Sequence, residues 1–566
     1  MNKERWHFMG IGGQGISAVA QMVLEARGNN VVVSGCDMQA SATTRALQDI
    51  GVPVEIGHSP DHLVDIDKLV VVPAALVLNP DHPELLMARE RGIPLITWQE
   101  MLGELMRQKC VISVSGVHGK GTTTAMLSLM LVDAGLDPTC EVGAVVPRFG
   151  VNYRLGKSQY FVNEADEFYN NFWHYHPRVA VVTSIEFEHP EFFADYAAFL
   201  DAFEHFVRGM DMESDWPVPP TLILNANSAG CFELLARLKD WSGQVVMYAV
   251  EGLAVFEKDM NAAPEENKQA VLEGIATGNS GETRQESLAP DVHSQIVMTF
   301  EAYDVKLGGE TSFRVRGRSA QGSWEPETNA GDTRIRLRLP GAHNVQNALA
   351  ALTVASVLGI DADTIVKTLE GFSGIRRRFE IRNQEPIQVN GQPMDVILVD
   401  DYAHHPTAIA ATLEAAHRRY SGRRLVAVYQ PHMFSRTKTF FEQFLHAFDL
   451  AAVVIIADIF PARERDTGLI SARELVDAMA RQPHFQQPEI LRGAQDDMGC
   501  AQDDMAVDAM AGRPHFQHGA QVWHGGSVQA ATLLLHSILR PGDLVLVMGA
   551  GDIYTLTDKV LQDLPE

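Results

Sequence analysis

The sequence lacks several features that would each point to a particular class of protein. It contains no run of about 18 or more apolar residues, the length that spans a bilayer, so we expect no membrane insertion. The polar N-terminus leads directly into a strand pattern, so we expect no signal peptide. Basic residues are scarce, because 46 Lys and Arg stand against 72 Asp and Glu, which gives a formal net charge of −26. This balance argues against a nucleic-acid partner, which requires a basic surface.

Cysteine is also rare, and its arrangement excludes two kinds of site. The five cysteines are scattered through 566 residues and form no C-x-x-C pair. Neither a disulfide framework nor a zinc motif is therefore expected, and the pattern is typical of a protein from the reducing cytoplasm. These cysteines are Cys36, Cys110, Cys140, Cys231 and Cys500.

Alternating strand and helix patterns along the chain predict an α/β protein. A hydrophobic content of 46% is enough for each domain to bury a normal core. We predict three domains, a Rossmann-like domain, a central ATPase-like domain with a phosphate loop, and a second Rossmann-like domain. Their expected bounds are 1–108, 109–373 and 374–566.

A glycine-rich turn opens the first domain between a short strand, Trp6–Met9, and a helix from Ile16 to about Arg27. A second strand follows, and then Asp37, 22 residues after the last glycine of the turn. Glycines let the backbone approach a pyrophosphate, and an acid at this spacing can bind ribose hydroxyls. A tight structural turn, with Asp37 as a helix cap, is the alternative. The candidate residues for a nucleotide or sugar nucleotide are Gly10, Gly12, Gly13, Gly15 and Asp37.

The stretch from Val111 to Thr124 predicts a phosphate loop. A buried strand leads into a glycine loop and then into a helix over Ala125–Ala134. Backbone N–H groups and the helix dipole then point at one place, and Lys120 adds a charge for the β/γ-phosphates of a nucleotide. Gly121 follows the lysine, so the first hydroxyl for Mg²⁺ comes one residue late, and a merely tight strand–helix turn is the alternative. The residues of the expected nucleotide site are Gly116, His118, Gly119, Lys120, Gly121, Thr122 and Thr123.

Acids and a histidine follow the next two strands of this domain. The strand Tyr160–Asn163 ends in Glu164-Ala165-Asp166-Glu167, and the strand Val179–Thr183 leads to His189. Because the carboxyl ends of parallel strands meet at one edge, these side chains fit Mg²⁺ ligands beside a phosphate loop. Alternatively, Glu164 caps a helix and His189 is a surface turn residue. Further on, Asn344 and Asn347 share one face of a helix, either to bind adenine or as plain caps.

The third domain places polar residues or glycine after four strands, at the functional edge of a doubly wound sheet. Two other stretches have no chemical interpretation. The polar segment of about 261–293 is expected to be a surface insertion, and a loop of about 477–518 carries a tandem duplication.

Together these segments resemble the Mur ligases, the ATP-dependent amide-forming enzymes of peptidoglycan synthesis. The resemblance covers nearly the whole chain outside the two insertions. The motifs that carry it are Gly10–Gly15, Gly116–Thr124, Glu164–Glu167, His189, His343–Ala348, Arg377–Phe379, Asp401–Pro406, Gln430–Thr437 and Gly549–Ile553.

The resemblance implies that ATP phosphorylates the lactyl carboxylate of UDP-N-acetylmuramate and that the amine of L-alanine then attacks the acyl phosphate. The third domain would close over the second to exclude water. Thr122 or Thr123 and Glu164 would hold one Mg²⁺, and His189 a second. The remaining implied roles are Arg377 or Arg378 at the transferring phosphoryl group, Asn344, Asn347 and Asp401 at adenosine, and His404, His432 and Arg436 at the amino acid.

Two alternatives remain open. Arg148–Gly156 and Glu186–His189 are more similar to the relative that attaches a recycled L-Ala-γ-D-Glu-meso-diaminopimelate tripeptide, whereas Gln430–Thr437 is similar to the alanine-adding enzyme. Gly121, where the alanine ligase has Thr, allows a non-catalytic nucleotide-binding relative. The substrates are small molecules in every case, and a monomer or a homodimer is expected.

Overall fold

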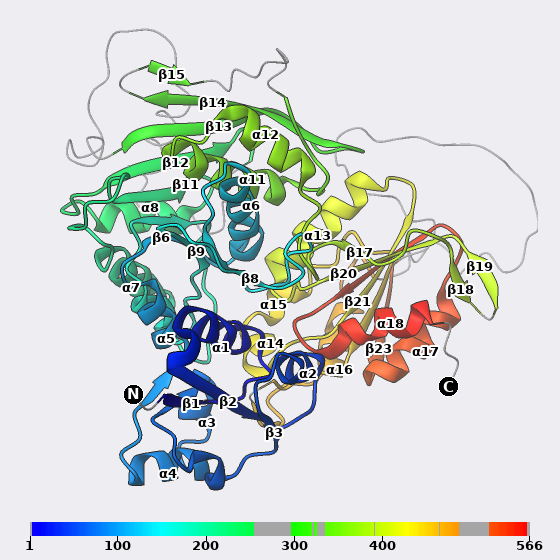
Figure 1. Cartoon of the computed structure of the whole chain (residues 1–566). Coiled ribbons are helices and arrows are strands. Elements are labelled where there is room, and N and C mark those ends of the chain that lie inside the picture. Colours follow the sequence, from blue (N-terminus) through cyan, green and yellow to red (C-terminus); the bar gives the residue numbers. More distant parts are fainter. Residues whose placement is uncertain are drawn as a thin grey trace, which may run out of the picture. The chain divides into compact units, whose positions relative to one another are not determined.

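The computed structural model describes residues 3–253, 296–319, 322–324, 334–389, 391–462, 464–485 and 520–562 (Figure 1). The expected insertion at 261–293 and most of the duplicated loop, residues 486–518, lie outside these residues. The chain divides into two compact units. One consists of residues 1–306, 311–338 and 342–376, and the other of residues 307–310, 339–341 and 377–566. The predicted domain boundaries at 108 and 373 stay predictions.

Three large sheets with helices packed on them confirm the expected α/β class with a Rossmann-like sheet at each end of the chain, and a fourth sheet has only two strands. The first sheet is parallel, in the order β3-β2-β1-β4-β5. The glycine turn therefore leaves β1 beside the point where strand order reverses. The elements are β1 (Glu4–Met9), α1 (Gln14–Arg27), η1 (Gly28–Asn30), β2 (Val31–Asp37), α2 (Ala42–Asp49), β3 (Val54–Ile56), η2 (Pro60–Leu63), β4 (Lys68–Val71), α3 (Pro73–Leu78), α4 (Pro83–Glu90), β5 (Leu95–Thr97) and α5 (Trp98–Met106).

Strand β1 contributes to two cores because successive side chains of a strand point to opposite faces. Trp6 and Phe8 pack into the core that includes residues of α1 and α5. Met9 lies in a second core with Leu63 of η2 and Leu85 of α4. His7, which alternates with Trp6 and Phe8, therefore faces η2 and α4.

The central sheet has eleven strands in the described residues, and β6 lies between β9 and β10 in parallel register. The loops after β9 and β10 therefore flank the loop after β6. The elements are β6 (Cys110–Ser115), α6 (Lys120–Asp133), β7 (Thr139–Glu141), β8 (Tyr153–Arg154), β9 (Tyr160–Glu164), η3 (Phe168–His174), β10 (Val179–Val182), α7 (Tyr196–Arg208), β11 (Thr221–Asn225), α8 (Ala229–Arg237), β12 (Gln244–Val250), β13 (Ile296–Lys306), β14 (Thr311–Ser319), β15 (Gly322–Trp324), β16 (Ile335–Leu337), α11 (Ala342–Val357) and α12 (Ala362–Gly371).

Helix α6 begins at Lys120, five residues earlier than the expected start at Ala125. Gly119 is the N-cap, with a left-handed backbone at φ 81° and ψ −5° that a glycine adopts without strain. Lys120 and Gly121 therefore belong to the first turn of the helix.

The second unit contains a sheet in the order β17-β20-β24-β21-β22-β23. All pairs are parallel except β17 with β20, so β20, β21 and β24 end at the same edge. The edge strand β23 has no counterpart among the strands expected from the sequence. The elements are β17 (Glu380–Ile381), β18 (Ile387–Val389), β19 (Gln392–Met394), β20 (Val396–Asp401), α13 (Pro406–Arg419), β21 (Arg424–Tyr429), α14 (Phe434–Thr439), α15 (Phe441–Phe444), β22 (Val453–Ala457), α16 (Ala472–Met479), β23 (Gln521–Gly526), α17 (Val528–Ile538), β24 (Asp543–Met548), η6 (Asp552–Tyr554) and α18 (Thr555–Leu561).

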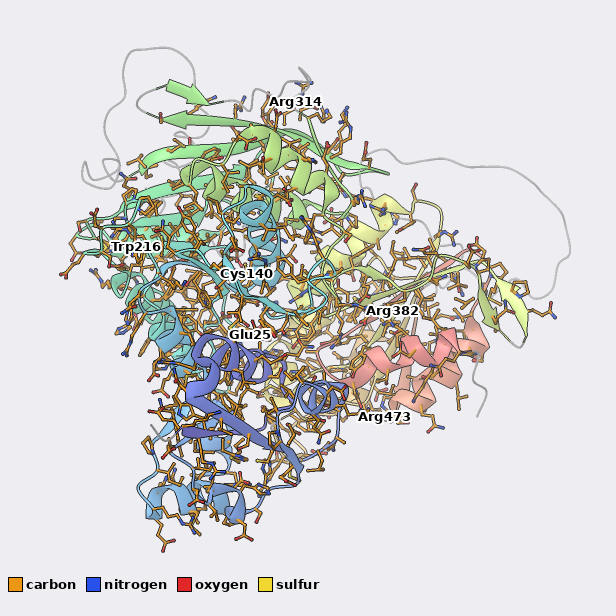
Figure 2. The ribbon with its side chains drawn as sticks, viewed as in Figure 1. Glu25, Cys140, Trp216, Arg314, Arg382 and Arg473 are labelled. Carbon is orange, nitrogen blue, oxygen red and sulfur yellow. The ribbon has the colours of Figure 1, made fainter. Side chains whose placement is uncertain are left out.

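Two further observations bear on the expectations from composition. Within the ranges that the structure describes, no helix combines the length and apolar character needed to cross a bilayer. The four cysteines found there are buried and free, including Cys140, which Figure 2 labels. Cys500 lies outside the described residues.

Candidate active site

The loop between β6 and α6 is hydrogen-bonded to the residues that follow β10. Gly116 has φ +118°, and a Cβ atom there would lie 2.8 Å from the backbone nitrogen of Ser184. The N–H of Val117 donates to the Ser184 carbonyl at 3.0 Å, and the N–H of His118 donates to Ser184 Oγ at 3.1 Å. The first turn of α6, residues 120–122, presents N–H groups that helix geometry leaves without intrahelical acceptors. Together with the helix dipole, these N–H groups suit an anion such as phosphate.

Lys120 lies among the carboxylates at the end of β9. Its Nζ is 2.8 Å from Glu167 Oε2 and 3.9 Å from Asp166 Oδ1, and only 13% of the side chain is exposed. Burial by itself lowers the pKa of Lys120, but the carboxylates of Glu167, Asp166 and Glu164 outweigh burial and raise the pKa. Lys120 is therefore a fixed positive charge at neutral pH, in a position to exchange a carboxylate partner for a phosphate.

Asp166, Glu167 and His189 form a cluster that fits a divalent cation. Their ligand atoms all lie within 4.8 Å of one another. His189 has a left-handed backbone at φ 57°, and its Nδ1 lies 3.0 Å from Glu191 Oε1. Two carboxylates with an imidazole offer mainly oxygen ligands, as Mg²⁺ prefers. From the sequence, Asp166 and Glu167 belong to the acidic run expected beside Mg²⁺, but the ligand role was given to Glu164 alone. Their position after β9 was the signal that could have found them.

Glu164, the acid chosen from the sequence, contacts the segment that follows β7. Its Oε2 accepts a hydrogen bond of 2.7 Å from the N–H of Gly143. A Cβ atom on Gly121 would lie 2.9 Å from the same oxygen and 3.4 Å from Ile375 Cδ1. The glycine after the lysine therefore leaves room for the Glu164 carboxylate. The structure groups His189 with Asp166 and Glu167 rather than with Glu164, and the assignment of Glu164 and Thr122 to a metal stays a prediction.

The amide side chains of α11 touch the phosphate loop itself. Asn347 lies so close to Gly119 that no Cβ atom fits there, and its Oδ1 is 3.5 Å from Thr123 Oγ1. Asn347 Nδ2 also donates to Asn344 Oδ1 at 3.3 Å. Both asparagines are buried. This pair supports the glycine turn, and the predicted adenosine contact of Asn344 and Asn347 stays a prediction.

The structure brings together the candidate residues of the first domain. Asp37 Oδ2 accepts a 2.9 Å hydrogen bond from the N–H of Gly12, and Gly10 has φ 80°. Gly13 is the N-cap of α1. Packing requires glycine at position 15, because a Cβ atom there would lie 2.7 Å from the Trp98 ring. Asp37 thus holds the glycine turn in shape, and its contact with a ribose stays a prediction.

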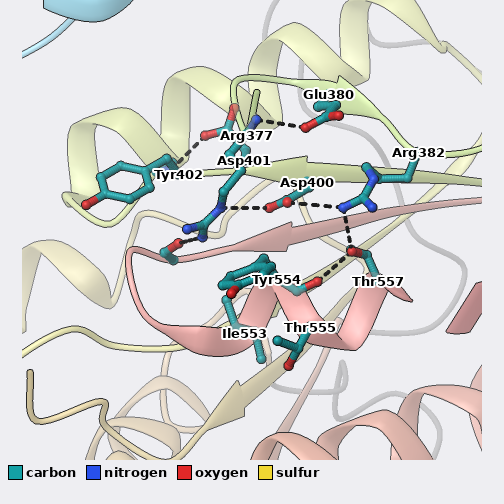
Figure 3. A network of polar contacts seen from close by, with 12 residues as sticks. Arg377, Glu380, Arg382, Asp400, Asp401, Tyr402, Ile553, Tyr554, Thr555 and Thr557 are labelled. Carbon is teal, nitrogen blue, oxygen red and sulfur yellow. Dashed lines mark hydrogen bonds and ion pairs between the residues drawn. The ribbon is translucent and has the colours of Figure 1, made fainter. Parts of the chain in front are cut away.

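The Arg377 side chain contacts a backbone carbonyl, a carboxylate and two aromatic rings within the second unit (Figure 3). One Nη donates to the Gly549 carbonyl at 2.6 Å, and Nε lies 3.6 Å from Asp400 Oδ1. The guanidinium carbon lies 5.1 Å from the ring centroid of Tyr402 and 4.6 Å from that of Tyr554. These contacts join the ends of β20 and β24, and the predicted role of Arg377 at the phosphoryl group stays a prediction.

Arg378 differs from its neighbour. Its guanidinium carbon lies 5.1 Å from the Tyr402 ring centroid, and among the described residues it forms no hydrogen bond or ion pair. Asp401, expected at adenosine, accepts hydrogen bonds of 2.7 Å from the N–H groups of Phe379 and Ala403. Burial raises the pKa of Asp401, and Arg378 counteracts this effect. Arg378 is thus the arginine of this run that is available to an anion.

The three residues expected at the amino acid lie together in the second unit. Arg436 Nη1 is 3.0 Å from His432 Nδ1, and the rings of His432 and His404 are 5.9 Å apart between centroids. His404 Nδ1 donates to the Tyr402 carbonyl at 3.0 Å. Arg436 is only 2% exposed, so its guanidinium has a fixed position. The residues for the phosphate loop and for the amino acid are thus each assembled within one unit.

A helix N-terminus with a buried lysine, beside carboxylates at the ends of parallel strands, defines the class of ATP-using enzymes with a phosphate loop. Sequence comparison then identifies the family. The Mur ligase catalytic domain matches residues 5–110, the Mur ligase middle domain 114–355, and the Mur ligase glutamate ligase domain 377–551. The chain belongs to the Mur ligase family and is an ATP-dependent ligase of the amide-forming type.

Similar proteins cover the chain from end to end. The UDP-N-acetylmuramate–L-alanine ligase of Geobacter sp. (strain M21) is 32% identical over 99% of this chain and 97% of its own. That of Desulforapulum autotrophicum is 32% identical over 100% of both chains. The UDP-N-acetylmuramate–alanine ligase of Thermotoga maritima has the same fold, with a TM-score of 0.66 at 21% identity over 99% of this chain and 98% of that one. The family resemblance drawn from the motifs is confirmed.

Proposed function

We propose that this chain joins L-alanine to the lactyl carboxylate of UDP-N-acetylmuramate, with ATP converted to ADP and phosphate, in the synthesis of peptidoglycan precursors. The observation that carries the proposal is full-length similarity to alanine-adding ligases, in a chain whose β6–α6 loop presents Lys120. Four buried free cysteines are consistent with the cytoplasm. A monomer or homodimer needs no further partner for this reaction.

In the first step, a carboxylate oxygen of UDP-N-acetylmuramate attacks the γ-phosphorus of ATP, and ADP leaves. Two anions approach each other, so positive charge lowers the barrier most. Lys120 and the first-turn N–H groups of α6 supply charge and dipoles that are already in place. Asp166, Glu167 and His189 would hold Mg²⁺, which neutralises phosphate charge when bound. Arg378 is the arginine that we assign to the phosphoryl group.

In the second step, the neutral amine of L-alanine attacks the acyl carbon, the acyl–oxygen bond breaks, and the leaving phosphate carries away the proton that the nitrogen loses. Arg436 suits the carboxylate of the amino acid, because a fixed guanidinium binds a carboxylate with two parallel hydrogen bonds. His404 and His432 lie beside it and would shape the pocket for a small side chain. The glycine turn with Asp37 would bind the uridine nucleotide.

The test is the release of ADP from ATP in the presence of UDP-N-acetylmuramate and Mg²⁺, with L-alanine or with the L-Ala-γ-D-Glu-meso-diaminopimelate tripeptide as the amine. We expect turnover with alanine and little with the tripeptide. Turnover with the tripeptide alone would reject the alanine assignment. If ATP binds and neither amine gives ADP, the chain is a nucleotide-binding relative without catalysis.

A further inference from the structure

A buried cluster of metal-ligand side chains lies in the first domain, away from the phosphate loop. The ligand atoms of His7, Cys36, His62 and Glu84 all lie within 4.8 Å of one another. His7 comes from β1, Cys36 from β2, His62 from η2 and Glu84 from α4. From these positions we propose that the four side chains bind one zinc-class divalent cation, which joins the sheet to η2 and α4. Neither the phosphate loop nor the amino-acid site accounts for this set.

Two distances within the cluster are close to those of a tetrahedral zinc site. Cys36 Sγ lies 3.4 Å from Glu84 Oε1, and Zn–S and Zn–O bonds of ordinary length place the two ligand atoms about 3.5 Å apart. His62 Nδ1 lies 2.9 Å from the same Glu84 oxygen, so little movement would bring it to a metal. One sulfur, two imidazoles and one carboxylate form a donor set typical of zinc.

His7 is oriented as a metal-binding histidine is. Its Nδ1 lies 2.9 Å from the Ser34 hydroxyl, while Nε2 is buried and contacts no hydrogen-bond partner in the described residues. The residue is 2% exposed, so bulk solvent does not reach this nitrogen. A histidine that binds a metal through one nitrogen is oriented in this way through the other.

The charges also favour a dication. The Glu84 carboxylate is fully buried, and within the described part of the chain its ion-pair partners are only His58 and His62, with no lysine or arginine. A buried carboxylate without a cation is costly. Zinc binding would displace the thiol proton of Cys36 to solvent, and the thiolate and carboxylate would together neutralise the two charges of the metal.

The experiment measures zinc binding to the full chain after chelation and dialysis. We expect one equivalent of zinc by mass spectrometry of the metal, and, with Co²⁺ as the probe, a thiolate-to-cobalt absorption band. Cys36→Ser should abolish that band and Glu84→Gln should weaken zinc affinity at least about 10-fold. Cys231→Ser, which changes a buried cysteine outside the cluster, is the matched control and should retain both the cobalt absorption band and the zinc affinity.

His62→Gln keeps the test decisive if Cys36→Ser does not fold, because His62 is partly exposed on η2 and its side chain is 18% exposed. It should keep the wild-type circular dichroism and lose at least about 10-fold in zinc affinity. Zinc should also raise the melting temperature of the wild type and not that of Cys36→Ser. Sub-stoichiometric zinc in the folded wild type, or an unchanged cobalt band in Cys36→Ser, would overturn the proposal.

Discussion

Lys120 Nζ lies 2.8 Å from Glu167 Oε2, at the end of the strand next to the one that precedes the phosphate loop. The pair holds the ammonium in place before any nucleotide binds. Under the proposed function, a phosphate at the N-terminus of α6 would compete with Glu167 for this ammonium, and Glu167 would then be able to bind a cation.

We therefore expect Lys120→Met to reduce ADP release at least about 100-fold, since it removes a fixed charge from the developing transition state. The measurement is the steady-state rate with saturating alanine and UDP-N-acetylmuramate. Lys157→Met, at an exposed position of the same domain, is the matched control and should retain the wild-type rate. Normal turnover by a folded Lys120→Met variant would contradict the assigned role of the loop.

Thr122 is the first hydroxyl after Lys120, and Gly121 leaves room for Glu164 beside it. We expect Thr122→Val to raise the Mg²⁺ concentration that gives half-maximal activity at least about 10-fold, because one oxygen ligand is lost. Thr124→Val is the control, since the Thr124 hydroxyl donates to the Lys120 carbonyl within the helix. Equal Mg²⁺ requirements in the two variants would remove Thr122 from the metal site.

The two adjacent arginines should respond differently to substitution. Arg378→Ala should lower the rate at least about 100-fold with a smaller loss of stability than Arg377→Ala, since Arg378 contacts the Tyr402 ring but forms no hydrogen bond or ion pair among the described residues. Arg377→Ala should destabilise the second unit by about 1–3 kcal/mol, because it leaves Asp400 and the Gly549 carbonyl without this donor. ADP release measures the rate of each variant, and thermal unfolding measures its stability. The reverse pattern would show that Arg377 binds the phosphoryl group.

Asp400 predicts a pH dependence of stability. Burial raises its pKa from 3.8 to about 6, although Arg377 and Arg382 partly counteract burial. The folded state therefore holds this proton more tightly than the unfolded chain. The stability contributed by the proton is present below about pH 4 and is lost as the pH rises to about 6. A difference of about 2 pKa units corresponds to about 3 kcal/mol.

Unfolding of the wild type and of Asp400→Asn by urea, from about pH 4 to pH 7, measures this effect. The variant does not titrate at this position, so the stability of the wild type relative to the variant should fall across this range. Parallel profiles for the two proteins would show that Asp400 does not titrate there.

The sequence predicted well those features that depend on neighbours along the chain. The strand–loop–helix around Lys120 and the glycine turn at Gly10 form where they were expected, because local backbone preferences decide them. The predicted start of α6 was wrong by five residues, because the first turn of the helix, which follows Gly119, has the composition of a loop. Strand β23 was missed because its burial alternates weakly at a sheet edge.

Only the tertiary structure decided which side chains meet. The acidic run places Glu164 and Glu167 three residues apart, and strand direction alone does not show which of them contacts Lys120. The same holds for Arg377 and Arg378, whose guanidinium groups differ because only one reaches Gly549 across the sheet.

The amino-acid sequence by itself determined the family, the order of the motifs along the chain and the position of the strand–loop–helix that we expect to bind phosphate. These follow from residue types at fixed short spacings, which fix local conformation. The fold decided that Glu167 pairs with Lys120, that Arg377 contacts the Gly549 carbonyl, and that His7, Cys36, His62 and Glu84 converge. Such contacts join residues from separate strands and helices, so strand order, pleat direction and packing determine them.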